Sequence, residues 1–356
     1  MAQINKPTDY FNTVLYTGNG GTQSITGVNF QPDWSWFKVR SEVGSHRLVD
    51  SVRGNTKYLF SNGTDAEATV TTNVTSFDSD GFSLGNGSIN ESSRTYASWN
   101  WLASNTSGSS NTDGSITSTV SANTTSGFSI VSWTGTGADA TVGHGLSQAP
   151  TIFILKNRTD VSDWRIGQVL TSTNNMTDGN GYYMELNDTK ASSNPGSATT
   201  WGATPTAPTS SVFTVGSTNA HNGSGDNMIA YCFAEKKGYS KFGSYTGNAS
   251  DSAGGPFIYL GFKPAFYMIK RTDTTGSWII KDNLRPGYNV NGSYLVANDS
   301  IAEATGSGNV ASDEVSNGIK IRGFSSSINA SGGTYIYMAF AENPLVGTNN
   351  IPATAR

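Results

Sequence analysis

One stretch of sequence occurs three times, and it constrains the fold of this chain more than any other feature. In each copy a proline opens a run of large apolar residues, and a lysine ends the run. The run is too short for a helix of ordinary length and is rich in aromatic and β-branched residues, so it predicts a buried strand. Proline is tolerated at the first position of a strand, where its missing N–H costs no ladder bond. The three copies begin at Pro32, Pro150 and Pro264 and reach their lysines at Lys38, Lys156 and Lys270.

The residues on both sides of this strand repeat as well. Before it, an aromatic residue runs into a Thr-Gly turn. After it comes a run of constant length from a tyrosine to an asparagine, and each copy closes on an aromatic strand. Agreement at so many spaced positions predicts one module used three times. The flanking segments are 16–18, 133–135 and 245–247, then 58–62, 183–187 and 294–298, then 96–101, 229–233 and 335–340.

Short apolar strands separated by turn residues every ~8–12 positions are typical of antiparallel sandwiches. The predicted fold is therefore all-β, with three tandem β-sandwich modules of jelly-roll or concanavalin-like type. We place the modules at residues 1–103, 126–236 and 237–344. Residues 104–125, rich in Ser, Thr, Asn and Gly, are predicted to be a flexible linker with a possible edge strand, and 345–356 a C-terminal tail.

The composition narrows the classes of partner. Charged residues make up 13% of the chain, against about 25% in an average soluble domain, while the 11% of aromatic residues argues against disorder. A net charge of −4 predicts neither a nucleic-acid partner nor an anionic-membrane partner. No apolar run is long enough to span a membrane, and the N-terminus lacks the apolar core of a signal peptide. We expect synthesis in a host cytoplasm.

Residues suited to metal or thiol chemistry are few. The three histidines do not stand at metal-ligand spacing, and the single cysteine, Cys232, offers no thiolate pair and is expected to be a buried apolar residue. The stretch that starts at Asp78 resembles the start of a calcium loop but lacks its closing glutamate, so we interpret it as a turn. We predict no metal, no cofactor and no enzyme activity.

Carboxylates are a stricter test of enzyme activity, because glycan-cleaving enzymes need a pair of them. Glu67 and Glu303 occupy the same position in modules one and three, where module two has Ser192. Residues at equivalent places in separate modules can meet only if the modules face one another. We therefore assign no catalytic residue and keep a glycan depolymerase as an alternative.

Two acid–base pairs also recur at equivalent positions. Asp50 precedes Arg53 in module one, and Asp282 precedes Arg285 with the same spacing in module three. A structural ion pair or turn anchor is the interpretation we favour for both.

Aromatic and imidazole rings give the only positive indication of a ligand. Trp164 and Trp278 follow their repeated strands at similar distances, and His46 lies in that region of module one. Such rings can stack on a sugar face while neighbouring polar residues form hydrogen bonds. The alternative is that they fill the core of the protein.

Four segments resemble a repeat module of virion proteins from tailed bacteriophages of marine bacteria and cyanobacteria. They are residues 114–135, 143–150, 231–235 and 241–247. The resemblance implies a structural protein of tail-fibre or tail-tip type with a concanavalin-like or jelly-roll sandwich, and it implies no catalytic residue.

We therefore expect a virion structural protein, a tail-fibre or tail-tip subunit that attaches to host-surface glycan. Its expected partners are further copies of itself, as a homotrimer, and other virion proteins. The alternatives are a capsid-decorating or tail adaptor protein with a purely structural role, and the depolymerase.

Overall fold

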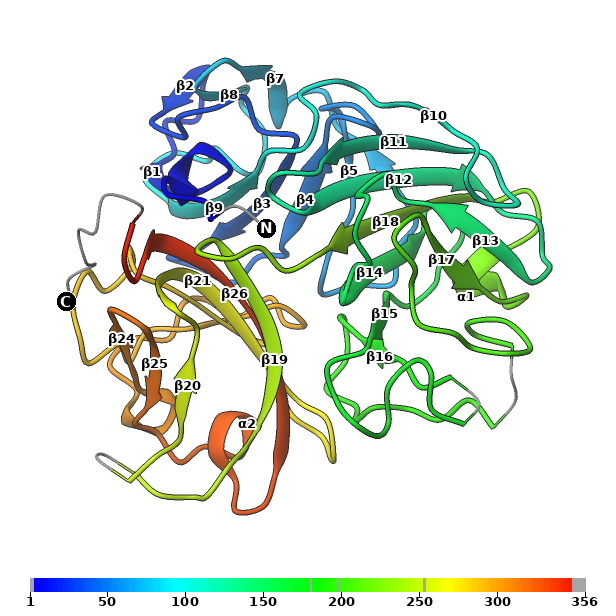
Figure 1. Ribbon diagram of the computed structural model, residues 1–356. Helices are drawn as coiled ribbons and strands as arrows, with labels where there is room; N and C mark the ends of the chain where they lie inside the picture. Colours follow the sequence, from blue (N-terminus) through cyan, green and yellow to red (C-terminus); the bar gives the residue numbers. More distant parts are fainter. Residues whose placement is uncertain (1–2, 180, 197–198, 252–253, 348–356) are drawn as a thin grey trace.

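A computed structural model describes residues 3–179, 181–196, 199–251 and 254–347 (Figure 1). Antiparallel strands make up most of these ranges, and this confirms the predicted all-β sandwich fold. The α-helices in the described ranges are single turns. The helical segments are η1 (Pro7–Asp9), α1 (Asn219–Asn222), η2 (Gly308–Val310) and α2 (Ser326–Asn329).

Module one contributes two facing sheets. Its larger, inner sheet has the strand order β1-β9-β3-β4, and its smaller, outer sheet has the order β2-β8-β7, with a short β5-β6 pair beside them. The strands are β1 (Phe11–Thr17), β2 (Gln23–Thr26), β3 (Trp34–Val39), β4 (Arg47–Asp50), β5 (Lys57–Tyr58), β6 (Ala68–Thr69), β7 (Val74–Asp78), β8 (Gly81–Leu84) and β9 (Thr95–Trp101).

Module two has the same plan with two added strands at one edge. The inner sheet has the order β10-β11-β12-β18-β14-β15-β16, and β13 pairs with β17 in the outer layer. The strands are β10 (Ser109–Asn111), β11 (Ser118–Asn123), β12 (Phe128–Thr134), β13 (Ala140–Gly143), β14 (Ile152–Asn157), β15 (Arg165–Gln168), β16 (Met184–Glu185), β17 (Val212–Val215) and β18 (Asn227–Phe233).

Module three repeats the plan once more. Its inner sheet has the order β19-β26-β21-β22-β23, and its outer sheet has the order β20-β25-β24. The strands are β19 (Ser240–Thr246), β20 (Phe257–Tyr259), β21 (Phe262–Arg271), β22 (Ile279–Asp282), β23 (Leu295–Val296), β24 (Ser312–Val315), β25 (Gly318–Ile321) and β26 (Thr334–Pro344).

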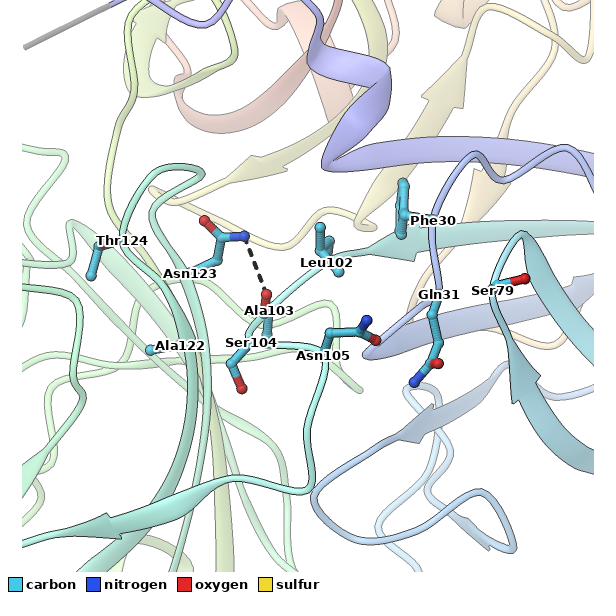
Figure 2. Close-up of a pocket in the computed structure, with 10 residues that line it drawn as sticks. All are labelled: Phe30, Gln31, Ser79, Leu102, Ala103, Ser104, Asn105, Ala122, Asn123 and Thr124. Atoms are coloured by element: carbon cyan, nitrogen blue, oxygen red, sulfur yellow. Dashed lines mark hydrogen bonds between the residues drawn. The ribbon is translucent and has the colours of Figure 1, made fainter.

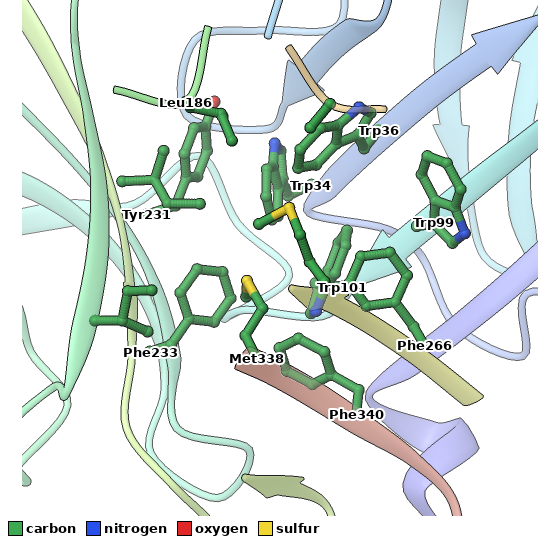
Figure 3. Packing of buried hydrophobic residues seen from close by; sticks show 14 of the residues in the cluster. Trp34, Trp36, Trp99, Trp101, Leu186, Tyr231, Phe233, Phe266, Met338 and Phe340 are labelled. Carbon is green, nitrogen blue, oxygen red and sulfur yellow. The ribbon is translucent and has the colours of Figure 1, made fainter. Parts of the chain in front are cut away.

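The repeated strands β3, β14 and β21 are buried on both faces. Alternate side chains of a strand point to opposite faces, so one set enters the module's own outer core and the other set enters a core that all three modules share. Trp34 of β3 packs on Tyr231 of module two with ring centroids 4.4 Å apart, and Phe266 of module three packs on Trp101 of module one. Figure 3 shows these rings converging from the three inner sheets. Burial on both faces explains why the three runs are apolar throughout.

The prolines follow the prediction in part. Pro32 and Pro150 lie just before β3 and β14, but Pro264 lies inside β21, where the pairing with β26 is irregular. Proline lacks an N–H for the sheet ladder and is accommodated at such a bulge. A glycine with positive φ stands upstream of each proline, where an L side chain would be strained. These are Gly27, Gly145 and Gly261, at 89°, 68° and 78°.

The predicted linker is not a free tether. Residues 109–111 form β10, which pairs with β11, and β10 is the edge strand of the sheet. The segment before it is fixed by the buried carboxylate of Asp33, which accepts hydrogen bonds from the backbone N–H groups of Ala103 and Asn105 at 2.7 and 2.8 Å. Composition pointed to flexibility because the strand carries Ser and Asn in place of apolar residues. Most of the predicted tail, residues 348–356, lies outside the described residues.

Candidate functional site

The three modules meet at three interfaces, which we number by the modules they join: the first joins one and two, the second two and three, the third three and one. At each interface a ring N–H or ring nitrogen of one module contacts a backbone carbonyl of the neighbouring module, and the three carbonyls occupy equivalent positions. Trp164 donates to Phe60 O at 2.7 Å across the first interface, and Trp278 donates to Glu185 O at 2.8 Å across the second. At the third, His46 Nε2 lies 2.9 Å from Val296 O.

This placement corrects the glycan-stacking hypothesis for His46, Trp164 and Trp278. All three side chains are buried, with 2% or less of their surface exposed. Their polar nitrogens are used in the contacts between modules, and their rings belong to or pack against the shared core. A sugar has no access to these rings, so the alternative that they fill the core is correct.

The repeated tyrosine-to-asparagine runs present these carbonyls. In each run the asparagine Oδ1 accepts a hydrogen bond from the backbone N–H of the ring residue in its own module. Asn62, Asn187 and Asn298 do so at 2.9, 2.8 and 2.7 Å. The equal lengths of the three runs therefore place the asparagine and the carbonyl two positions before it in the same geometry each time.

The lysines that end the repeated strands also cross the interfaces. Lys156 Nζ donates to Thr64 O at 3.1 Å, Lys270 Nζ to Lys190 O at 2.7 Å, and Lys38 Nζ to Ser300 O at 3.2 Å. Burial lowers the pKa of each of these lysines to about 8. In the sequence these lysines mark only the ends of the apolar runs, whereas in the structure they form hydrogen bonds between modules.

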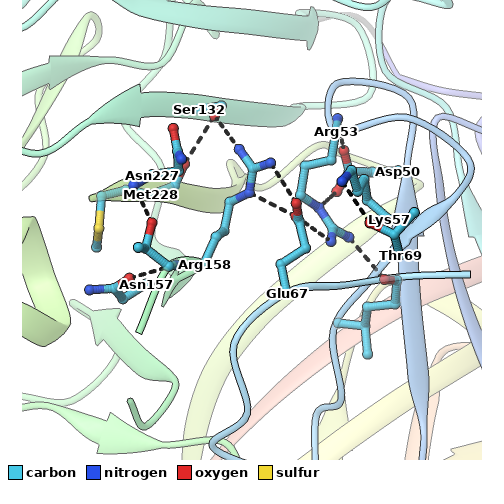
Figure 4. A network of polar contacts seen from close by, with 12 residues as sticks. Asp50, Arg53, Lys57, Glu67, Thr69, Ser132, Asn157, Arg158, Asn227 and Met228 are labelled. Atoms are coloured by element: carbon cyan, nitrogen blue, oxygen red, sulfur yellow. Dashed lines mark hydrogen bonds and ion pairs between the residues drawn. The ribbon is translucent and has the colours of Figure 1, made fainter. Parts of the chain in front are cut away.

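A buried ion cluster lies at the first interface (Figure 4). Asp50 pairs with Arg53, which lies 3.2 Å from Glu67, and Glu67 accepts two hydrogen bonds from Arg158 of module two at 2.8 and 2.9 Å. Tyr231 of module two donates to Asp50 at 2.7 Å. Burial alone would raise the pKa of Glu67, but the two guanidinium groups hold it below its usual value. The carboxylate therefore stays ionised and cannot act as a proton donor near neutral pH.

The third interface carries the equivalent cluster. Asp282 accepts from Arg285 at 2.6 Å and from the Trp99 indole of module one at 3.0 Å. Glu303 binds Arg40 of module one at 2.5 Å. The structural ion pairs predicted for Asp50 with Arg53 and for Asp282 with Arg285 are both present, and their side chains are fully buried.

The partners across these interfaces could not be found from the sequence. Arg158 and Arg40 end equivalent strands, but module three has Thr272 there, so the position does not stand out as repeated. Tyr231 and Trp99 also differ in type. Only the glutamate partners of the two arginines gave a sequence signal, because Glu67 and Glu303 occupy one repeated position, at which module two has Ser192.

Surface hollows lie beside this framework. One, of about 620 Å³, is lined by Phe30, Gln31 and Ser79 of module one, by residues 102–105 and by residues 122–124 (Figure 2). Asn123 donates to Ala103 O across it. A second cleft, of about 510 Å³, lies where module two runs into module three.

Other candidate groups are buried. Cys232 lies in β18 in the outer core of module two, and burial raises the pKa of its thiol above its usual range. Within the described residues, no group of three His, Cys, Asp or Glu side chains is arranged to hold a metal ion. None of the helices in those ranges is long and apolar enough to cross a membrane.

Residues 6–344 match a single protein family, described as domain of unknown function DUF7483. The chain belongs to this family. The DUF7483 match runs through all three modules, so the shared-core assembly is covered as one unit. No curated protein and no solved structure matches the chain.

Proposed function

We propose that this DUF7483 protein is a structural protein of a tailed-bacteriophage virion, a tail-fibre or tail-tip subunit that attaches to host-surface glycan. The observation that carries the proposal is that equivalent residues of the three modules are used between modules. The ring nitrogens, the strand-end lysines and two of the three acidic positions all join one module to the next. Together with the sequence resemblance to virion repeat modules, this use favours architecture over turnover.

Three modules joined around a shared core present three outer sheets, which suits attachment through many weak contacts. Linked binding sites gain effective concentration without new chemistry. The proposal includes other virion proteins as partners and a homotrimer of this chain, which would multiply the number of presented surfaces. Molar mass from light scattering distinguishes the trimer from a monomer.

The location of the chain in an intact particle tests the proposal. Purified virions are analysed by mass spectrometry and labelled with gold-tagged antibody against this protein. Label at the distal tail together with binding of the purified protein to host cells is the expected result. Label spread over the head instead supports a capsid-decorating role, and absence from the particle contradicts both.

A depolymerase is distinguished from an attachment protein by the reducing ends that it releases from polysaccharide. Host polysaccharide incubated with the protein is expected to release no reducing ends. Glu67 and Glu303, the carboxylates considered for such a role, are each bound to an arginine of the neighbouring module.

A further inference from the structure

Two exposed aromatic rings lie side by side on the outer sheet of module three. Phe257 and Tyr259 belong to β20, with 47% and 54% of their surface exposed, while Ile258 between them is 4% exposed and part of the core. Residues two apart on a strand share a face, so both rings stand on the solvent side. Phe257 reaches toward Gly318, the partner of Tyr259 on β25, and its Cζ lies 3.1 Å from where a Cβ of Gly318 would be. Adjacent exposed aromatics indicate an interaction surface.

Neither of the other modules has this feature. The central buried residue is shared, because Ile25 of β2 and Val142 of β13 pair with the outer sheet as Ile258 does. The flanking residues differ. Module one has the exposed Ser24 and Thr26 there, and module two has the partly exposed Thr141 and the buried Gly143. The fold does not require rings at these positions, so their presence in module three calls for another cause.

A cleft beside Tyr259 supplies charge and hydrogen-bonding groups. It holds about 510 Å³ and is lined by Tyr259, Lys241, Lys237 and Glu235, with Leu260 and Leu345 among the apolar residues. Lys241 Nζ lies 5.6 Å from the centroid of the Tyr259 ring. In the register that aligns the aromatic-Thr-Gly turns, modules one and two have Asn12 and Ser129 in place of Lys241. The lysine is thus specific to the module that carries the rings.

We propose that this cleft binds an acidic saccharide. An aromatic ring offers a flat apolar face to the C–H side of a sugar, and two lysines against one glutamate favour a ligand with a carboxylate or phosphate. This inference rests on the proposed attachment function and adds to it the site and the ligand class.

The test uses the full-length protein on an array of bacterial and plant glycans, including oligogalacturonates, sialylated glycans and neutral malto-oligosaccharides. We expect binding to acidic glycans and little binding to neutral ones. The variant F257S/Y259T carries the residues of module one and is expected to keep the wild-type melting temperature while its binding falls at least tenfold. K241N, which introduces the asparagine that module one has at this position, is expected to weaken binding of the acidic glycans.

The reverse variant S24F/T26Y is the matched control. It places two rings on module one, where Asn12 stands in place of the lysine, and it is expected to gain no acidic-glycan binding. Wild-type protein that binds no acidic glycan, or binding that F257S/Y259T leaves unchanged, overturns the site. Detection of the chain in virions together with host-cell binding, but without acidic-glycan binding, would sink this inference alone, whereas acidic-glycan binding by a protein absent from virions would sink only the virion assignment.

Discussion

At five equivalent positions, the first interface carries mostly charged side chains and the second carries neutral ones. The backbone contact is the same, since Glu67 N donates to Arg158 O at 2.8 Å and Ser192 N donates to Thr272 O at 2.9 Å. The side chains differ at every polar position. The first interface has Asp50, Arg53, Glu67, Arg158 and Tyr231, and the second has Gln168, Thr171, Ser192, Thr272 and Met338.

From this difference we expect the five positions to act as one unit. A buried ion pair is tolerable when every charge has its partner, and removal of one partner leaves an uncompensated buried charge. The second interface has none of these charges and is held by neutral contacts such as the 3.1 Å hydrogen bond from Ser244 Oγ of module three to Leu170 O of module two. The third interface has kept the whole set, with Trp99 in the place of Tyr231. The shared core and the backbone contacts therefore set the geometry of the interfaces, and the side chains at the five polar positions can differ from one interface to another.

The largest effect is expected from breaking the charged set. Arg53→Leu leaves Asp50 and Glu67 without their shared guanidinium and should lower the free energy of unfolding by about 3–5 kcal/mol. Arg285→Leu should cost a similar amount at the third interface. Thr171→Val at the second interface, the matched control, removes one neutral hydrogen bond and should cost about 1 kcal/mol. Urea unfolding measures all three, and equal losses for R53L and T171V would contradict the comparison.

A smaller effect is expected when the whole set is exchanged. The variant D50Q/R53T/E67S/R158T/Y231M gives the first interface the composition of the second. Because no charge is left unpaired, we expect a loss of about 1–2 kcal/mol in the free energy of unfolding, less than for R53T alone despite the larger number of changes. A loss equal to the sum of the five single variants would show that the positions act independently.

The fold could be predicted from the sequence because its strongest signals are local. Apolar runs, turn glycines and repeated spacings report directly on strand and turn, and Asp50 and Arg53 are close in the chain, so their pairing follows from spacing. The buried aromatics were visible too, but a ring that faces a sugar and a ring that faces another module give the same sequence pattern. For that reason the sequence left both environments open for Trp164 and Trp278, and the structure places both rings in the core.

The shared core could not be predicted, because it depends on how three modules are placed in space. Nothing in residues 32–40 says that Trp34 will stack on Tyr231, nearly two hundred positions away. The same holds for Lys38, Lys156 and Lys270, whose partners are backbone carbonyls and so leave no trace in residue type. The candidate glycan cleft could not be found from the repeat, because Phe257 and Tyr259 occupy positions at which the three modules differ in residue type.

The third interface is expected to differ from the other two in how its stability depends on acidic pH. His46 occupies the place of Trp164 and Trp278, and burial, together with the charge of Lys38, lowers its pKa well below the usual value. Below pH ~6.5 the unfolded chain binds a proton there that the folded chain does not, so stability falls as the pH falls, by up to about 1.4 kcal/mol per pH unit for one proton. His46→Gln should reduce this slope between pH 6.5 and 5. Urea unfolding at three pH values measures it, and an unchanged slope would place the acid-sensitive group elsewhere.

The smallest effect is expected at the lysines, which are alike at all three interfaces. Lys38, Lys156 and Lys270 have a pKa lowered by burial to about 8. Between pH 8 and 9 the unfolded chain therefore holds protons that the folded chain releases, and these lysines make stability rise with pH. Linkage of one proton limits the contribution of each lysine to about 1 kcal/mol over that unit. Lys38→Met, Lys156→Met and Lys270→Met should each reduce the slope of stability against pH by the same amount, while Lys6→Met, at an exposed side chain, should not. Unequal reductions would show that the lysine contacts, like the ion clusters, distinguish one interface from another.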